Sequence, residues 1–186
     1  MFIHKNTGTI ELPNGLVISA EFSKIDFENS VFFSEATPYD YGTPPFQWYR
    51  LNGGQLDGHM LNINLCFSHD VLEKFSTSAN FSQSNPRKWE NFSLDNERQS
   101  KAFHDQLLQK LFGDPHKKTL IHDGVNQPGL EYRFDYYFKW GQVWSLYDSR
   151  IGSADIGVKY KPKYIDRHTD YFIKKAWRAV SSFFRQ

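Results

Sequence analysis

The chain has 186 residues, and its 22 lysine and arginine residues nearly balance its 21 aspartate and glutamate residues, so the formal net charge is +1. A chain of this length fills one hydrophobic core but is short for two, so we expect a single domain over residues 1–186. The charge balance lacks the basic excess of typical nucleic-acid-binding proteins, so no nucleic-acid partner is expected. Aromatic residues make up 17% of the chain, which favours a sheet-rich domain or a large aromatic contact surface.

The N-terminal part predicts short strands followed by a long connection. Residues 9–12 and 17–22 flank a Pro-Asn-Gly sequence that favours a tight turn, so a hairpin is expected there. A third strand is predicted over residues 30–34. Proline and glycine punctuate residues 38–58, which indicates an irregular connection with one short strand at 46–51. Long connections often carry function, and this one is crowded with aromatic residues: Tyr39, Tyr41, Phe46, Trp48 and Tyr49.

Strand and helix patterns both occur in the middle of the chain. Residues 60–67 alternate between apolar and polar side chains, as does a strand with one buried face. Residues 70–75 have the pattern of a short helical turn, and residues 75–87, rich in serine and asparagine, indicate an edge strand with a loop. A long helix is predicted over residues 94–112, between a capping serine and a glycine, with these apolar residues in one stripe: Ala102, Phe103, Leu107, Leu108 and Leu111.

The C-terminal part begins with a polar loop over residues 116–129 and continues into an aromatic ribbon. Every second residue from Tyr132 to Trp140 is aromatic, which is the period of a strand. Gly141 interrupts this pattern and indicates a bulge or a bend. The strands that follow, 143–147 and 154–160, are expected to pair across the turn between them.

A last helix is predicted from residue 166 or 169 to residue 184, with apolar side chains on one face and basic ones on the other. Together these elements predict an α+β fold: a single domain with a bent antiparallel sheet and two long helices.

The sequence also bears on where the protein acts. Its one cysteine, Cys66, cannot form an internal disulfide, which suits a reducing compartment. The N-terminus lacks the apolar region of a secretory signal, and no apolar run reaches the roughly 20 residues of a membrane span. A cytoplasmic protein without a membrane partner is therefore expected.

The sequence contains no recognised catalytic or metal-binding motif. The seven histidines form no His-Glu-x-x-His pair, and no nucleophile elbow or phosphate-binding glycine motif is present. We therefore expect no metal, no cofactor and no catalytic residue. Two alternatives stay open: a small hydrolase or nuclease using His59, His104 or His122, and an RNA-binding module using the basic residues of the C-terminal helix.

One stretch of the aromatic ribbon carries a family resemblance. Residues 140–152 read Trp-Gly-Gln-Val-Trp-Ser-Leu-Tyr-Asp-Ser-Arg-Ile-Gly. With the aromatic content, this stretch resembles the bacterial immunity proteins of interbacterial competition, including those of contact-dependent growth inhibition. The resemblance implies a protein that binds a cognate toxin acting in the cytosol, such as a nuclease, and occludes the toxin's active site.

A candidate surface for this partner lies in the N-terminal third. Acidic residues outnumber basic ones there, and toxins of the nuclease kind are commonly basic, so acidic and aromatic side chains are expected to form the contact. Aromatic anchors carry much of the binding energy in such interfaces. The predicted partner-binding residues are Tyr39, Asp40, Tyr41, Trp48 and Asp57.

Overall fold

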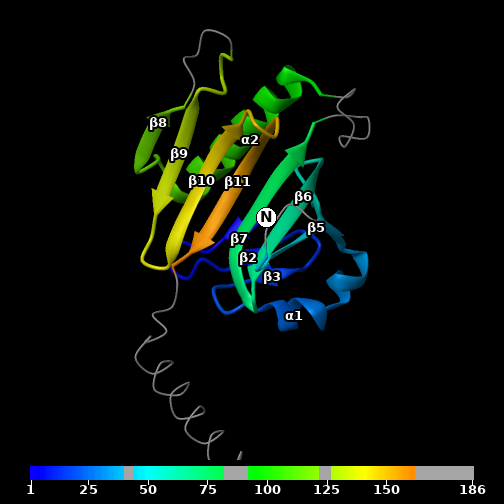
Figure 1. The fold of residues 1–186 in the computed structure, drawn as a ribbon. Coiled ribbons are helices and arrows are strands. Elements are labelled where there is room, and N and C mark those ends of the chain that lie inside the picture. The colour runs from blue at the N-terminus through cyan, green and yellow to red at the C-terminus, as the bar shows by residue number, and fades with distance from the viewer. Residues whose placement is uncertain (40–43, 82–91, 122–126, 162–186) are drawn as a thin grey trace, which may run out of the picture.

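The computed structural model describes residues 1–39, 44–81, 92–121 and 127–161. An antiparallel sheet of eight strands forms its frame, in the spatial order β4-β5-β6-β7-β11-β10-β9-β8 (Figure 1). Strands that follow one another in the chain lie side by side, so the sheet consists of two meanders. The first contains β4 (Thr37–Tyr39), β5 (Phe46–Leu56), β6 (His59–Ser68) and β7 (Val71–Asn80), and the second contains β8 (Lys117–Leu120), β9 (Tyr132–Tyr137), β10 (Gly141–Asp148) and β11 (Ser153–Tyr160).

The two meanders meet at a short junction between β7 and β11. Within each meander, strands such as β6 and β7 pair along nearly their whole length. The junction has only three residue pairs in register: Phe75 with Val158, Ser76 with Gly157, and Thr77 with Ile156. Beyond Thr77 the two strands no longer pair, so the backbone groups that pointed across the junction need other partners.

One face of the sheet carries the hydrophobic core. Every second side chain of a strand points to this face, and these positions hold almost fully buried residues, among them Leu61, Ile63, Leu65, Phe75, Val143, Ile156 and Val158. The helix α2 (Leu94–Phe112) contacts β7, β10 and β11 on this side (Figure 1). No helix within the described residues has the length and apolar character that a membrane crossing requires.

The N-terminal segment forms a second covering layer on the same core. Its Phe27 ring lies 5.2 Å from the ring of Tyr49 on β5 and 5.8 Å from that of Phe67 on β6. Ile10 and Ile18, which face each other in a small three-stranded sheet, are fully buried in the same cluster. The elements of this layer are β1 (Phe2–Ile3), β2 (Ile10–Glu11), β3 (Val17–Ile18), α1 (Lys24–Glu28) and the 3₁₀ helix η1 (Val31–Glu35).

Side chains of α2 replace the strand pairing that is missing beyond the junction. The backbone N–H of Ala79 on β7 donates to Nε2 of His104 (3.0 Å), and the carbonyl of Ala79 accepts from Oγ of Ser100 (3.1 Å). On the other side, the N–H of Ala154 on β11 donates to the carboxylate of Glu97 (2.8 Å). The helix is therefore a source of hydrogen bonds as well as of apolar contacts.

Several sequence predictions are confirmed. The hairpin around the Pro-Asn-Gly turn is present as β2 and β3, and β6 occupies the predicted strand over 60–67. The long helix runs over the predicted residues 94–112, with Ser93 at its N-cap and Gly113 at a positive φ of 83° after it. β10 and β11 pair across the predicted turn.

The helical turn predicted over 70–75 is wrong, because these residues begin the strand β7. Leu72 and Phe75 are both buried although they are three residues apart, a spacing that is typical of a helix. A bulge explains this spacing: Phe67 of β6 faces Leu72, whereas Cys66 faces Lys74, so Glu73 is an extra residue. β7 also lies in the middle of the sheet and not at its edge, where the pattern of 75–87 had placed a strand.

The predicted strand over 30–34 and the predicted long loop over 38–58 are also wrong. Residues 31–35 form the 3₁₀ helix, in which Val31 is 78% exposed, so their alternation does not reflect two sheet faces. Most of the described part of 38–58 is strand: β5 runs through its two central glycines because an irregularity between Asn52 and Gln55 accommodates them. The predicted polar loop 116–129 likewise contains β8.

Two further predictions need correction at the C-terminal side. Gly141 is neither a bulge nor a simple bend, because Phe138 and Gly141 exchange backbone hydrogen bonds across a two-residue turn that joins β9 to β10. The expectation of two long helices is not borne out: α2 is the long helix of the described residues, and the helix predicted to end at residue 184 lies outside them.

The hydrogen bonds that α2 donates and accepts at the junction make a testable prediction. His104→Ala leaves the buried N–H of Ala79 without an acceptor and opens a cavity, so we expect a loss of about 2–4 kcal/mol in the free energy of unfolding, measured with urea. Gln106→Ala, an exposed change on the same helix, should stay within about 0.5 kcal/mol. Equal effects of the two changes would contradict a hydrogen-bonding role for His104.

Candidate binding face

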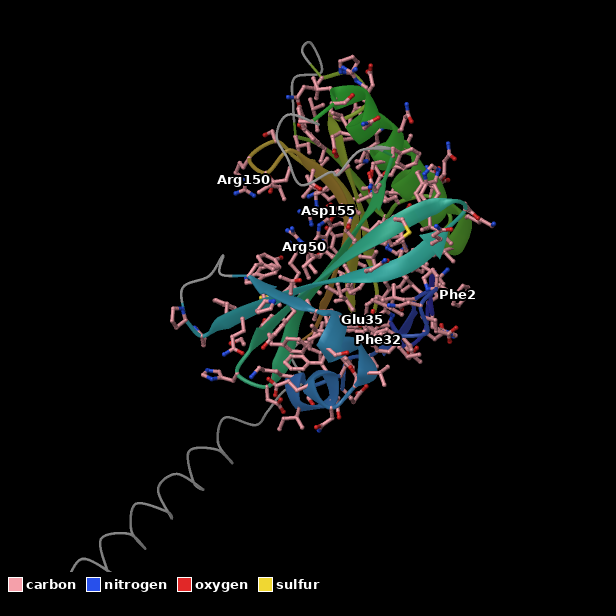
Figure 2. All side chains as sticks on the ribbon, turned by 90° about the vertical axis from the view of Figure 1, so that its right-hand side faces the viewer. Phe2, Phe32, Glu35, Arg50, Arg150 and Asp155 are labelled. Atoms are coloured by element: carbon pink, nitrogen blue, oxygen red, sulfur yellow. The ribbon has the colours of Figure 1, made fainter. Side chains whose placement is uncertain are left out.

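No described element covers the second face of the eight-stranded sheet, which we call the open face. Register places one residue from each of six neighbouring strands in a row across it: Arg50, Asn64, Ser76, Gly157, Trp144 and Asp135. Figure 2 shows Arg50, Asp155 and Arg150 on this side of the molecule, with Phe2 of the covering layer on the opposite side. Within the described residues, α2 and the N-terminal layer both pack on the other face, and neither lies over the side chains of the open face.

Aromatic rings and cations alternate across the open face. The ring of Tyr39 lies 5.8 Å from that of Trp48, and the Arg50 guanidinium lies 4.9 Å from the Tyr39 ring. The Lys74 ammonium lies 5.8 Å from both the Trp48 and the Trp144 rings. These distances are within the range of cation–π attraction. We call this set, completed by Arg133 at 5.0 Å from the Trp144 ring, the aromatic–cation band: Tyr39, Trp48, Arg50, Lys74, Trp144 and Arg133.

A glycine fixes the position of Trp144. Gly157 is the direct cross-strand partner of Trp144, and a Cβ placed on Gly157 would come within 2.2–2.6 Å of three indole atoms. The indole therefore lies against the bare backbone of β11, an arrangement that compensates for the missing side chain in a strand. The ring is half-buried and held in place before any ligand arrives.

Two of the carboxylates on the open face are already paired. Asp135 accepts hydrogen bonds from Nε of Arg133 (2.8 Å) and Nε2 of Gln142 (2.7 Å). Asp148 accepts from Nε of Arg150 (2.9 Å), and this hydrogen bonding lowers the pKa of the Asp148 carboxyl. The negative charge of each of these acids is therefore balanced by the positive charge of a neighbouring arginine.

Asp155, near the centre of the open face, differs from these two acids in its hydrogen-bond partner. Its carboxylate accepts a hydrogen bond from Oγ of Ser153 (2.8 Å). Burial raises the pKa of Asp155 to about 6, although that hydrogen bond and the charges of Lys74 and Arg50 act in the opposite direction. The surroundings thus leave the negative charge of Asp155 incompletely compensated.

The structure brings together some of the residues predicted to bind the partner. Tyr39 and Trp48 are neighbours in the aromatic–cation band. Asp40 and Tyr41 lie outside the described residues. Asp57 lies in the turn between β5 and β6, nine residues beyond Trp48, which is about 30 Å along an extended strand. Asp57 and Trp48 are thus at opposite ends of β5.

Two of the described acidic residues of the N-terminal third lie away from these aromatic residues, in the layer on the covered face. Asp26 completes the capping box of α1 by accepting from Ser23, and Glu28 pairs with Lys24 at 2.9 Å. The neighbours of Tyr39 and Trp48 are instead Arg50 and Lys74. Sequence reasoning missed Lys74, Trp144, Arg133 and Asp155, although the strand period already places Trp144 opposite the buried Val143.

Two of the histidines named in the enzyme alternative, His59 and His104, lie within the described residues and are both engaged in packing or hydrogen bonding. His104 is fully buried, and burial lowers its pKa to about 3, so it stays neutral and accepts the backbone bond from Ala79. His59 stacks on Phe81 at 3.8 Å, and His122 lies outside the described residues. Within the described ranges, no group of three histidine, cysteine or acidic residues is placed to hold a metal ion.

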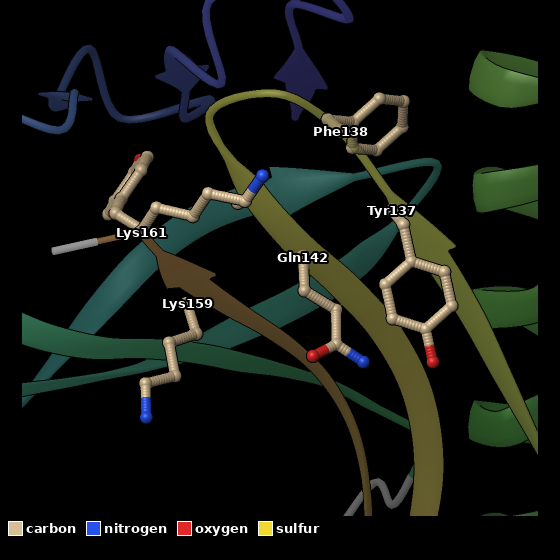
Figure 3. Close-up of a pocket in the computed structure, with 7 residues that line it drawn as sticks. Tyr137, Phe138, Gln142, Lys159 and Lys161 are labelled. Atoms are coloured by element: carbon tan, nitrogen blue, oxygen red, sulfur yellow. The ribbon is translucent and has the colours of Figure 1, made fainter.

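A shallow depression extends the open face where β10 begins and β11 ends (Figure 3). Its volume of about 280 Å³ falls just below the roughly 300–1,000 Å³ of typical small-molecule sites. Two amines, an amide and a phenol contribute polar groups to it: Lys159, Lys161, Gln142 and Tyr137.

The contact between Trp144 and Gly157 predicts that Gly157→Ala destabilises the protein when Trp144 is present and stabilises it when Trp144 is absent. Gly157→Ala should push the indole off β11 and lower the free energy of unfolding by about 1–2 kcal/mol, because the ring loses its packing and its cation–π contacts. In a Trp144→Ala background the same change should instead stabilise by about 0.5–1 kcal/mol, since alanine restricts the unfolded chain more than glycine. Urea unfolding of the four proteins measures both effects; the same sign in both backgrounds would contradict this packing.

The raised pKa of Asp155 predicts a pH dependence. Because the folded-state pKa of about 6 exceeds the ordinary value of 3.8, the contribution of Asp155 to stability is complete below pH 4 and is lost as the pH rises through 6. Asp155→Asn should therefore stabilise the protein at pH 8 by at most about 3 kcal/mol and have no such effect at pH 4. Asp148→Asn is the matched control: its lowered pKa gives the opposite sign, a loss at pH 8.

Comparison with known proteins gives no match for this chain: no protein-family model, no curated protein and no solved structure is significantly similar to it. The chemistry of the open face therefore has to be judged from its own residues.

Proposed function

We propose that this chain is an immunity protein that binds a cognate toxin through the open face and neutralises it by occlusion. The observation that carries the proposal is the aromatic–cation band on a sheet face that no described element covers. Tryptophan, tyrosine and arginine are the residue types most enriched among the energetic hot spots of protein interfaces. The band contains two tryptophans, one tyrosine and two arginines within one continuous set of contacts.

The band is organised before binding, which favours tight association. The Trp144 ring lies against Gly157, and Arg133 is held by Asp135 at 2.8 Å. Arg50 donates to the side-chain oxygen of Asn64 (3.3 Å), which also accepts from the Tyr39 hydroxyl (3.1 Å). Side chains already fixed in one conformation lose little entropy on binding, so more of the contact energy appears as affinity.

The segment that resembles immunity proteins contributes to this face. Residues 140–152 include β10 and the turn that follows it, and Trp144, Asp148 and Arg150 of this segment lie on the open side. The resemblance and the geometry therefore point to the same part of the molecule. This agreement supports an immunity protein over a histidine-based enzyme, because the described histidine that is most deeply buried, His104, accepts a backbone hydrogen bond and has its pKa lowered by burial.

A second candidate function is favoured by the same alternation of rings and cations. Aromatic side chains on a sheet face stack on the bases of single-stranded RNA, and neighbouring cations contact its phosphates. Such binding weakens steeply with salt because counterions are released. Binding to a protein through half-buried aromatic anchors depends much less on salt, so ionic strength separates the two functions.

The proposed function is tested by affinity capture from a lysate of the source cell. The full chain should retain one protein at stoichiometric amounts, and Trp144→Ala should lower its retention at least tenfold, since hot-spot residues contribute 2 kcal/mol or more. Phe2→Ala is the matched control, an exposed aromatic residue on the opposite side of the molecule. Circular dichroism of all three proteins checks that the fold is intact.

The outcomes separate the alternatives. Retention of the partner at raised salt, together with inhibition of that partner's toxicity, is expected for an immunity protein. Capture that is equal for the wild type and Trp144→Ala would show that the open face is not the binding site. Capture of RNA that disappears at raised salt would assign the face to nucleic acid instead.

A further inference from the structure

The side chain of Lys74 occupies a cage between two tryptophans in the middle of the open face. Lys74 is on β7, and its Nζ lies 5.8 Å from the ring centroids of both Trp48 on β5 and Trp144 on β10. Each distance is within the range in which a ring face attracts a cation. The cage is thus suited to a positive charge, and in the free protein the chain itself supplies that charge.

Carboxylates stand beside this cage without forming an ion pair with the lysine. Asp155 is on the same face of β11 as Gly157, the cross-strand partner of Trp144, and two residues before it, while Asp148 is on the same face of β10 as Trp144. Asp148 forms an ion pair with Arg150. In the described part of the chain, Lys74 forms no ion pair within 4 Å, and the one hydrogen bond to Asp155 comes from Ser153. Asp155 therefore keeps acceptor capacity that the resident lysine does not use.

A guanidinium suits these surroundings better than the resident ammonium. It is planar, stacks on an indole face and donates two parallel hydrogen bonds to one carboxylate. An ammonium is a compact point charge that cannot do both at once. The contact of Lys74 with the two rings is also at a partly exposed site, where cation–π attraction is weak, so displacement of Lys74 is easy.

We propose that Trp48, Trp144 and Asp155 form a receptor for an arginine side chain of the protein partner, and that Lys74 fills this receptor until the partner displaces it. The inference rests on the proposed function, because it names the group by which the partner docks on the open face. Charge complementarity supports it, since the incoming cation meets Asp155, whose hydrogen-bond partner among the described residues is the neutral hydroxyl of Ser153. Arg50 is anchored by Asn64 and stays in place beside the cage.

The test uses small probes on the full chain: N-acetyl-arginine amide, the lysine analogue, and the citrulline analogue, which has the shape of arginine without its charge. Binding is followed by NMR through the indole N–H signals of Trp48 and Trp144. Lys74→Ala removes the competing cation, so we expect it to bind the arginine probe about fivefold more tightly than the wild type does. The citrulline probe should bind neither protein, and the lysine probe should bind Lys74→Ala more weakly than the arginine probe does.

Two control variants separate the cage from general electrostatics. Lys110→Ala removes one positive charge from the exposed side of α2 and should leave the affinity for the arginine probe unchanged. Asp155→Asn in the Lys74→Ala background should abolish the gain in affinity while leaving the fold intact, because asparagine has nearly the same size and still accepts a hydrogen bond from Ser153.

Three results would overturn the inference: equal affinity of wild type and Lys74→Ala for the arginine probe, a gain that survives Asp155→Asn, or indole shifts caused by an oligouridylate and not by the arginine probe. The last result would assign the cage to nucleic acid. Capture of a protein partner that depends on Trp144, combined with failure of the arginine test, rejects the receptor and leaves the proposed function standing. Loss of both rejects both.

Discussion

The fold depends on how two meanders are joined through only three residue pairs. β7 and β11 pair from Phe75 to Thr77 and then separate, which leaves backbone donors and acceptors inside the protein. Glu97, Ser100 and His104 of α2 satisfy these groups. Without these hydrogen bonds, two open strand edges would face each other in the interior, and each unpaired backbone group buried there would cost about 1–3 kcal/mol. The position of α2 and the burial of Ser100 and His104 on it are explained by this one constraint.

The same constraint leaves one face of the sheet without a covering element among the described residues. Both covering layers, α2 and the N-terminal elements, pack on the face where α2 forms its hydrogen bonds to β7 and β11. The opposite face presents two tryptophans, and it places a cation beside each ring. The charges therefore surround the exposed parts of both indoles with polar groups.

The sequence predicts elements well where one period continues without interruption. β6, α2, and the pair of β10 with β11 are predicted at nearly their correct bounds, because each has one buried face and clear turn or cap residues. The prediction fails where the period is broken. The extra residue Glu73 brings Leu72 and Phe75 to the same side of a strand at a spacing that is typical of a helix. The glycines of β5 are residues typical of a loop, although they lie within a strand.

The candidate site was only partly within reach of sequence reasoning. Tyr39 and Trp48 were found because they cluster within a few residues of each other. Trp144 and Lys74 come from strands far apart in the chain, and nothing local shows that they meet, because the register of the junction places them together. The charge expected around the aromatic residues also depended on which face each acid occupies, and the acids of α1 belong to the covering layer.

The junction has a further consequence, for the kinetics of folding. Within each meander the paired residues are close in sequence, whereas Phe75 and Val158 are 83 positions apart (158 minus 75). Hairpins of this kind form in microseconds, but closing a long loop costs chain entropy before any contact compensates for it. We therefore expect the two meanders to form early and their union to set the folding rate, which φ-value measurements at the junction would report. The open face, which spans both halves, would then be completed only when the two meanders join.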